Sequence, residues 1–113
     1  MASLSQETEV NNASGTADVT VLAAPASSTT RMIPENGITI YNNTGASATI
    51  TIQKALAASD KIKENFVLAS KDTWTNAWVT NLDLATSTLQ VFVDSTISSG
   101  TLDIDVSYRD EAQ

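Results

Sequence analysis

The side-chain types that most often carry out catalysis are scarce in this chain. It contains no histidine and no cysteine, so neither a Ser–His–Asp triad nor a cysteine nucleophile is available. The remaining candidates are Ser–Lys pairs, Ser59 near Lys61 and Ser70 beside Lys71, and neither lies in a supporting motif. Zinc sites in practice need Cys or His ligands. We therefore expect no enzyme activity, no catalytic residue and no metal.

Cofactor binding is not indicated either, because no glycine-rich phosphate loop is present. The four glycines lie singly in turns or near the N-terminus, whereas a phosphate-binding loop gathers several glycines at fixed offsets. For a glycosidase, the chain offers carboxylates but no convincing acid/base pair. We expect no cofactor.

Two acidic residues with regular spacing, Asp103 and Asp105, are followed at the same spacing by Ser107. A D-x-D-x-S run is faintly similar to the start of a calcium loop. However, the EF-hand pattern also needs a Gly at the sixth position and a Glu at the twelfth, and neither is present. Strand alternation explains the spacing without a metal, and outward carboxylates on a strand discourage edge pairing. The run therefore predicts a solvated strand face.

Trp74 and Trp78 allow two interpretations. They are an exposed platform on which a sugar ring stacks, or they are buried in the core or at a subunit contact, where aromatic residues are enriched. A strand would place Trp74, Asn76 and Trp78 on one face, and helical spacing of four would also bring the two tryptophans together. Because the chain has few other large residues, we predict a strand with buried tryptophans.

The charge balance bears on the class of partner. The formal net charge is −7, from 13 acidic and 6 basic residues. A duplex-binding surface needs clustered Lys and Arg, and the lysines between residues 54 and 71 are interrupted by Asp60 and Glu64. We expect no nucleic-acid partner. No stretch approaches the roughly 18 apolar residues of a membrane span, and the N-terminus lacks the basic and apolar regions of a signal peptide. We therefore expect no membrane partner and synthesis in a cytoplasm.

The chain divides into two parts by composition. Its length of 113 residues fits one domain with one core. Residues 1–16 are polar, contain no aromatic residue and show neither a helical nor a strand period. We predict a flexible N-terminal arm over residues 1–16 and a β-sandwich domain over residues 17–113.

Alternating apolar residues predict most of the strands in the second part. The stretch "ITIYNNTGASATITIQ", residues 38–53, predicts a β-hairpin with Gly45 in its loop. Residues 88–108 predict a second hairpin at the C-terminal edge, with Leu102, Ile104 and Val106 facing inward. Between the two hairpins, a loop followed by a strand over residues 65–69 competes with a helical turn over residues 57–64.

These patterns together predict the fold class. Seven to nine short strands with regular turn signals are typical of a sandwich or small barrel. We expect an all-β fold: a single antiparallel β-sandwich or small barrel (jelly-roll/Ig-like) with an extended N-terminal arm.

The order of features resembles small virion proteins of tailed bacteriophages, of the capsid decoration (cement) type. Such proteins often pair an "LL-APA-TR" opening with an "IYN" strand end, a "TVTV" strand and an acidic strand ending in "SYxD". Similar features occur here at Leu22–Arg31, Ile40–Asn42, Ala48–Ile52 and Ile104–Asp110. The "PENG" turn before Ile38 is an addition to that pattern.

The resemblance implies a structural role. Proteins of this type bind the outside of the assembled phage capsid and stabilise it, with the major capsid protein as partner, and form homo-oligomers, here expected to be trimers. The expected location is the virion surface. The alternatives are a neck, tail or head-fibre component, a carbohydrate-binding β-sandwich module, and a secreted adhesin-like domain.

The expected contact surfaces are the arm and the loop around residues 42–47, because the arm has no pattern for burying itself in its own domain. The candidate capsid or subunit contacts are Ser3, Leu4, Glu7, Val10, Asn42, Asn43, Thr44, Trp74 and Trp78.

Overall fold

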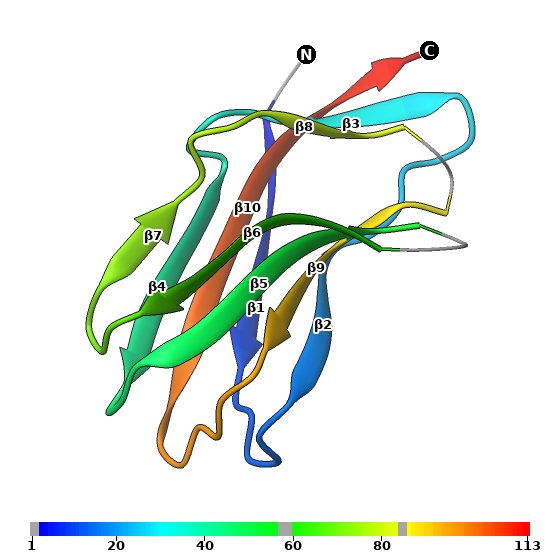
Figure 1. Cartoon of the computed structure of the whole chain (residues 1–113). Helices are drawn as coiled ribbons and strands as arrows, with labels where there is room; N and C mark the ends of the chain where they lie inside the picture. Colours follow the sequence, from blue (N-terminus) through cyan, green and yellow to red (C-terminus); the bar gives the residue numbers. More distant parts are fainter. Residues whose placement is uncertain (1–2, 57–59, 84–85) are drawn as a thin grey trace.

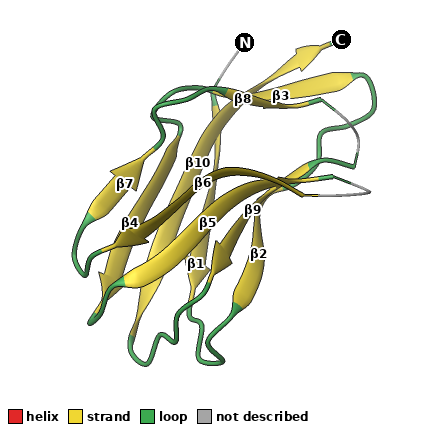
Figure 2. Cartoon of the chain, in the orientation of Figure 1, coloured by secondary structure: helices red, strands yellow, loops and turns green. Residues whose placement is uncertain are grey.

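The protein is an all-β sandwich. A computed structural model describes residues 3–56, 60–83 and 86–113, and within these residues the chain forms strands and loops but no helix (Figure 2). The strands make two antiparallel sheets that pack face to face (Figure 1). The predicted all-β sandwich is therefore confirmed. The described residues contain no helix with the length and apolar character that a bilayer crossing requires.

The first sheet is built around its longest strand. Its members are β1 (Leu4–Val10), β3 (Thr29–Ile33), β4 (Ile38–Thr44), β7 (Thr73–Thr75), β8 (Thr80–Leu82) and β10 (Gly100–Ala112). Strand β10 pairs with β4 over residues 100–106, with β3 over residues 109–112 and with β1 over residues 102–108. β7 then pairs with β4, and β8 pairs with β3. β10 is therefore an interior strand, and not the edge strand that the sequence predicted.

The second sheet has four strands in the order β2-β9-β5-β6. Their bounds are β2 (Ala17–Leu22), β5 (Ala48–Ala55), β6 (Asp60–Leu68) and β9 (Thr88–Val93). The register shifts by one residue in β2, between Thr20 and Leu22, and in β6, between Ile62 and Glu64. Such bulges bend a strand and increase its twist.

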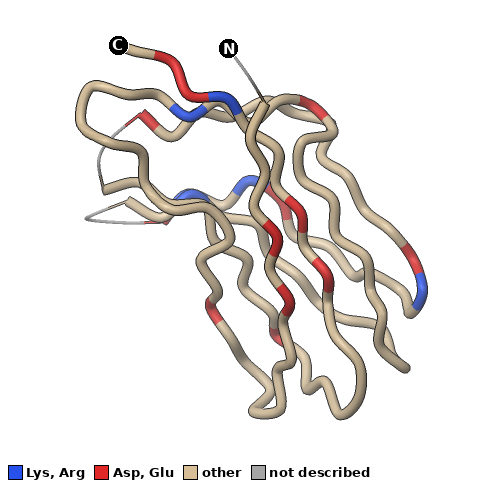
Figure 3. Tube along the Cα trace, turned by 180° about the vertical axis from the view of Figure 1, so that it is seen from behind, with Lys and Arg blue, Asp and Glu red and all other residues tan. Residues whose placement is uncertain are grey.

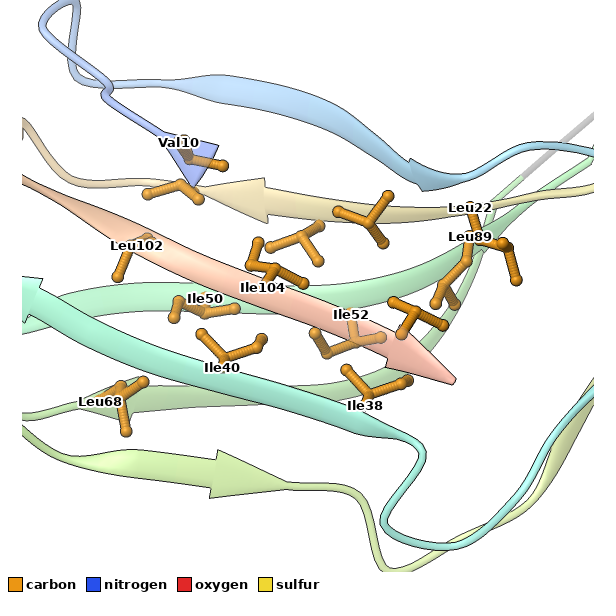
Figure 4. Close-up of a cluster of buried hydrophobic side chains, with 14 of the residues drawn as sticks. Val10, Leu22, Ile38, Ile40, Ile50, Ile52, Leu68, Leu89, Leu102 and Ile104 are labelled. Carbon is orange, nitrogen blue, oxygen red and sulfur yellow. The ribbon is translucent and has the colours of Figure 1, made fainter. Parts of the chain in front are cut away.

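The core lies between the two sheets and is aliphatic. Strand alternation turns Ile50 and Ile52 of β5 towards Ile40 of β4 and Ile104 of β10 (Figure 4), and all four side chains are buried. Leu102, like Ile104, faces inward as predicted. Burying each such side chain contributes about 1.5–3 kcal/mol.

Both predicted hairpins are wrong. β4 belongs to the first sheet and β5 to the second, so the loop through Gly45 carries the chain across the sandwich. β9 and β10 are likewise in different sheets. The physical reason is that alternation shows which face of a strand is buried but not which strand bonds to it. In a sandwich, the inner faces of both sheets carry the same pattern.

The predicted N-terminal arm is not seen. Residues 4–10 form β1, which pairs with β10 from Leu4 opposite Tyr108 to Val10 opposite Leu102. The backbone of β10 would otherwise be an open edge on this side, and β1 satisfies its hydrogen bonds. The sandwich therefore extends beyond the predicted boundary at residue 17.

The middle of the chain differs from its predictions in extent. Strand β6 begins at Asp60, earlier than the predicted strand over residues 65–69. The helical alternative is wrong for residues 60–64, because they pair with β5. The remainder of that alternative, residues 57–59, lies outside the described residues.

Candidate functional site

Four carboxylates project from the outer face of β1 and β10. Glu7 lies directly opposite Asp105, and Glu9 lies directly opposite Asp103. We call these four residues the acidic face. Figure 3 shows acidic positions on the two neighbouring strands. Side chains directly opposite each other on antiparallel strands have Cβ atoms about 4.5–5.5 Å apart, so two pairs of like charges are held in register.

No basic side chain of the described residues forms an ion pair with the acidic face. Within that part of the chain the ion pairs join Arg31 to Asp110 at 3.0 Å and Lys54 to Asp83 at 3.6 Å. Like charges directly opposite each other destabilise a sheet. The acidic face therefore lowers the stability of the isolated chain.

The acidic face borders a shallow groove of about 530 Å³. Thr39 and Tyr41 of β4 line it as well, together with Thr8 and Ile104, and Tyr41 lies opposite Asp103 across the β4–β10 pair. The carboxylates of the acidic face attract cations, and the hydroxyl groups of Thr39 and Tyr41 can accept hydrogen bonds. Among the residues that the structure describes, no three acidic side chains are grouped so that they could hold a metal ion.

The two tryptophans form a second polar–aromatic arrangement. The indole N–H of Trp78 donates to Oε1 of Glu64 at 2.8 Å, and that of Trp74 donates to Oε2 of the same residue at 3.2 Å. Phe66 stacks on Trp74 with ring centres 4.6 Å apart. We call Glu64, Phe66, Trp74 and Trp78 the tryptophan cluster. Because β6 belongs to the second sheet and β7 to the first, the cluster joins the two sheets at one edge of the sandwich.

A sugar would have to compete with these contacts. Phe66 covers one face of Trp74, and Lys63 Nζ lies 5.5 Å from the centre of the Trp78 ring. Both indole rings are half-buried and pack against the core. The cluster therefore has an evident structural role, independent of any ligand.

The predicted strand through both tryptophans is shorter than expected. β7 ends at Thr75, and the next residue, Asn76, is fully buried. Its side-chain amide donates to the carbonyls of Pro34 and Trp78, and its oxygen accepts the N–H of Ile38 at 2.8 Å. Asn76 thus fixes the bend that brings Trp78 to Glu64.

The predicted contact loop is partly interior. Asn42 is fully buried, and its amide donates to the carbonyls of Ala46 and Leu68 at 2.9 Å each. Thr44 is buried as well and donates to Asn42. Both were wrong as contact surfaces, because they hold the crossing between the sheets. Asn43 is exposed and accepts a hydrogen bond from Lys71 at 2.8 Å.

The predicted contacts in the N-terminal segment divide in the same way. Ser3 is exposed just before β1, and Leu4 is 45% exposed. Glu7 belongs to the acidic face. Val10 is buried in the core and was wrong as a contact. Of these four, Ser3, Leu4 and Glu7 remain available to a partner.

Two features were missed by sequence reasoning. The acidic face needs the pairing of β1 with β10, which brings Glu7 and Glu9 beside carboxylates roughly a hundred positions later. Sequence alternation alone contains no signal for that pairing. Glu64 did carry a signal, since strand alternation places it on the same face as Phe66, which packs against the core. An inward carboxylate requires a hydrogen-bond donor, and the two indoles supply it.

A further group of polar side chains lies on the second sheet. Gln53 Nε2 is 3.4 Å from both Asp18 Oδ1 and Asp60 Oδ2. Burial raises the pKa of Asp18 above its ordinary value of 3.8, and the nearby charge of Asp60 raises it further. Asp18 therefore binds its proton more tightly in the folded chain than in the unfolded chain.

Comparison with known proteins supports the fold. No protein-family profile matches the chain. No curated protein matches it at a significant level. A solved structure described as "Crystal structure of PirA" is similar, with a TM-score of 0.50 and 20% sequence identity, and the match covers 93% of this chain and 93% of that chain. At this identity the likeness concerns the fold alone.

Proposed function

We propose that this protein is a structural virion protein that binds the outside of a phage capsid and stabilises it. The resemblance in sequence pattern to capsid decoration proteins supports this role. So does the composition, which offers neither His nor Cys for catalysis. The observation that carries the proposal furthest is the acidic face, a surface whose charges find no cation in the described part of their own chain.

The acidic face is the proposed docking surface. Glu7 and Asp105, with Glu9 and Asp103, repel one another in the free protein. A basic surface on the shell would remove that repulsion and accelerate encounter through long-range attraction. Binding through this face should therefore weaken steeply as salt concentration rises.

The number of copies on the particle tests the proposed role. Quantitative mass spectrometry of purified particles of the phage that encodes the chain would compare it with the major capsid protein. A decoration protein predicts many copies in a fixed ratio to the shell subunit. A few copies would assign it to the neck, tail or a head fibre, and absence from the particle would overturn the proposal.

Two matched charge variants test the docking surface on the same particles. In the first variant the four residues of the acidic face are replaced by their amides. In the second, four exposed carboxylates elsewhere are replaced in the same way: Glu35, Asp72, Asp94 and Glu111. Both variants have the same net charge. The first should lose particle binding and its salt dependence, and the second should bind like the original protein. Equal losses would contradict docking through the acidic face.

A further inference from the structure

We propose that β1 is an exchangeable strand, which leaves β10 of its own chain and occupies the same position on β10 of a second copy. The interaction surface is thus the edge of β10, and the partner is another molecule of this protein. This inference depends on the sheet alone and does not require the capsid role.

The inward side of β1 holds it weakly in the core. Residues 4, 6, 8 and 10 face inward, opposite Tyr108, Val106, Ile104 and Leu102. Only Val10 is buried among the seven residues of the strand. Gln6 and Thr8 place polar side chains over the apolar row of β10, and Leu4 is 45% exposed. Releasing β1 therefore exposes little of its own apolar surface.

The outward side of β1 opposes its pairing with β10. Glu7 faces Asp105 and Glu9 faces Asp103, so two of the seven residue pairs are repulsive. The attachment of β1 then depends mainly on the backbone hydrogen bonds of one ladder, because β10 is its partner in the sheet.

The chain directly after β1 is firmly anchored, which confines the opening to the strand. The side-chain amide of Asn12 donates to the carbonyls of Val93 and Ser95, at 3.2 and 2.9 Å. The carbonyl of Asn12 accepts the N–H of Ile97 at 2.7 Å. Between this anchor and Val10 lies the exposed Asn11. Rotation near Asn11 would free β1 while β2 and β9 keep their contacts.

A second copy is the occupant that fits the vacated edge. Its β1 reproduces all seven residue pairs, including Val10 against Leu102. Exchange of an identical element conserves the contacts of the closed chain and costs little beyond the hinge. An open β10 edge would otherwise present unpaired backbone groups to solvent.

Mixing single-cysteine variants tests the exchange. The chain has no cysteine, so each introduced thiol is unique. Glu7→Cys and Asp105→Cys chains would be mixed at high concentration under mild oxidation. The proposal predicts a disulfide between chains that mass spectrometry assigns to positions 7 and 105. The same two substitutions in one chain should form an internal disulfide, and failure to form it would overturn the pairing itself.

The sheet supplies two matched controls in the same row. Thr39 of β4 also lies directly opposite Asp105, and Thr75 of β7 lies opposite Thr39. Thr39→Cys tests a neighbour of β10 that does not leave, and Thr75→Cys tests chance collision of an exposed thiol. The yield with Glu7→Cys should exceed both controls several-fold. A yield no greater than either control would overturn the exchange.

Discussion

Strand β10 has neighbours of opposite character on its two sides. On one side, β4 contributes Ile38 and Ile40, which are fully buried. On the other side, β1 places Gln6 and Thr8 at equivalent inward positions and two glutamates against two aspartates. The two strands have the same length, seven residues each. The backbone pairing of β10 with β1 is therefore similar in length to its pairing with β4. The side chains differ, because those of β4 belong to the core, whereas those of β1 leave it a separable edge strand.

The largest expected effect on the free energy of unfolding comes from the two inward side chains that flank one residue of β10. Ile40 of β4 and Thr8 of β1 both lie directly opposite Ile104. Ile40→Ala should lower the free energy of unfolding by about 2–5 kcal/mol, because it leaves a cavity between the sheets. Thr8→Ala should change it by no more than about 0.5 kcal/mol. Urea unfolding measures both, and similar losses would show that β1 is as integral as β4.

The tryptophan cluster should give the next largest effect. Glu64→Ala leaves both indole N–H groups without their acceptor, which should cost about 1–3 kcal/mol of unfolding free energy. Tryptophan emission should shift to the red and iodide should quench it more strongly. Glu64→Gln keeps one acceptor oxygen and should show a smaller change in both. An unaltered emission spectrum in Glu64→Ala would contradict a structural role for the cluster.

Reversing charge on β1 should stabilise the protein. Glu7→Lys places an ammonium group opposite Asp105, which should raise the unfolding free energy by about 0.2–1 kcal/mol. Glu35→Lys makes the same change of net charge at an exposed position that is not part of the acidic face. Thermal unfolding at low salt compares the two variants. The account requires the larger gain in Glu7→Lys, together with slower strand exchange in a Glu9→Lys background, because β1 must leave Asp103 before it can exchange.

The smallest effect concerns pH and lies in the other sheet. The pKa of Asp18 is raised in the folded protein above 3.8, so the folded state binds this proton more tightly than the unfolded state. The stability gained from the proton is present below pH 3.8 and is lost as the pH rises through the folded pKa. Asp18→Asn should therefore be more stable than the original protein at neutral pH and not below 3.8. Unfolding curves at both pH values check this, and an equal difference at both would contradict it.

The sequence predicted the strands better than their partners. Alternation identified Leu102, Ile104 and Val106 as inward-facing, because burial on one face has a direct signature of period two. The same signature led to two wrong hairpins. A loop such as Gly45–Ser47 can close a hairpin or cross a sandwich, and the choice depends on which sheet has a free edge when the whole chain packs.

The roles of the polar residues were hardest to predict, because they too depend on which strands pair in the folded chain. Residues 4–10 carry two apolar residues at the inward positions, Leu4 and Val10, and these are separated by the polar Gln6 and Thr8, so the segment was predicted to be an arm. They become a strand because β10 offers an edge, which is information from the far end of the chain. Asn42 and Asn76 were equally hidden, since a buried amide is recognised by the carbonyls around it and not by its neighbours in sequence.

The contrast between β1 and β4 is tested most directly by native-state hydrogen exchange of their backbone amides. Local opening exposes amides without global unfolding, so protection reports the stability of each strand separately. The account predicts that the bonded amides of β1 exchange much faster than those of β4, with the protection of β4 close to that of the whole fold. Equal protection of the two strands would contradict a separable β1 and, with it, the proposed exchange.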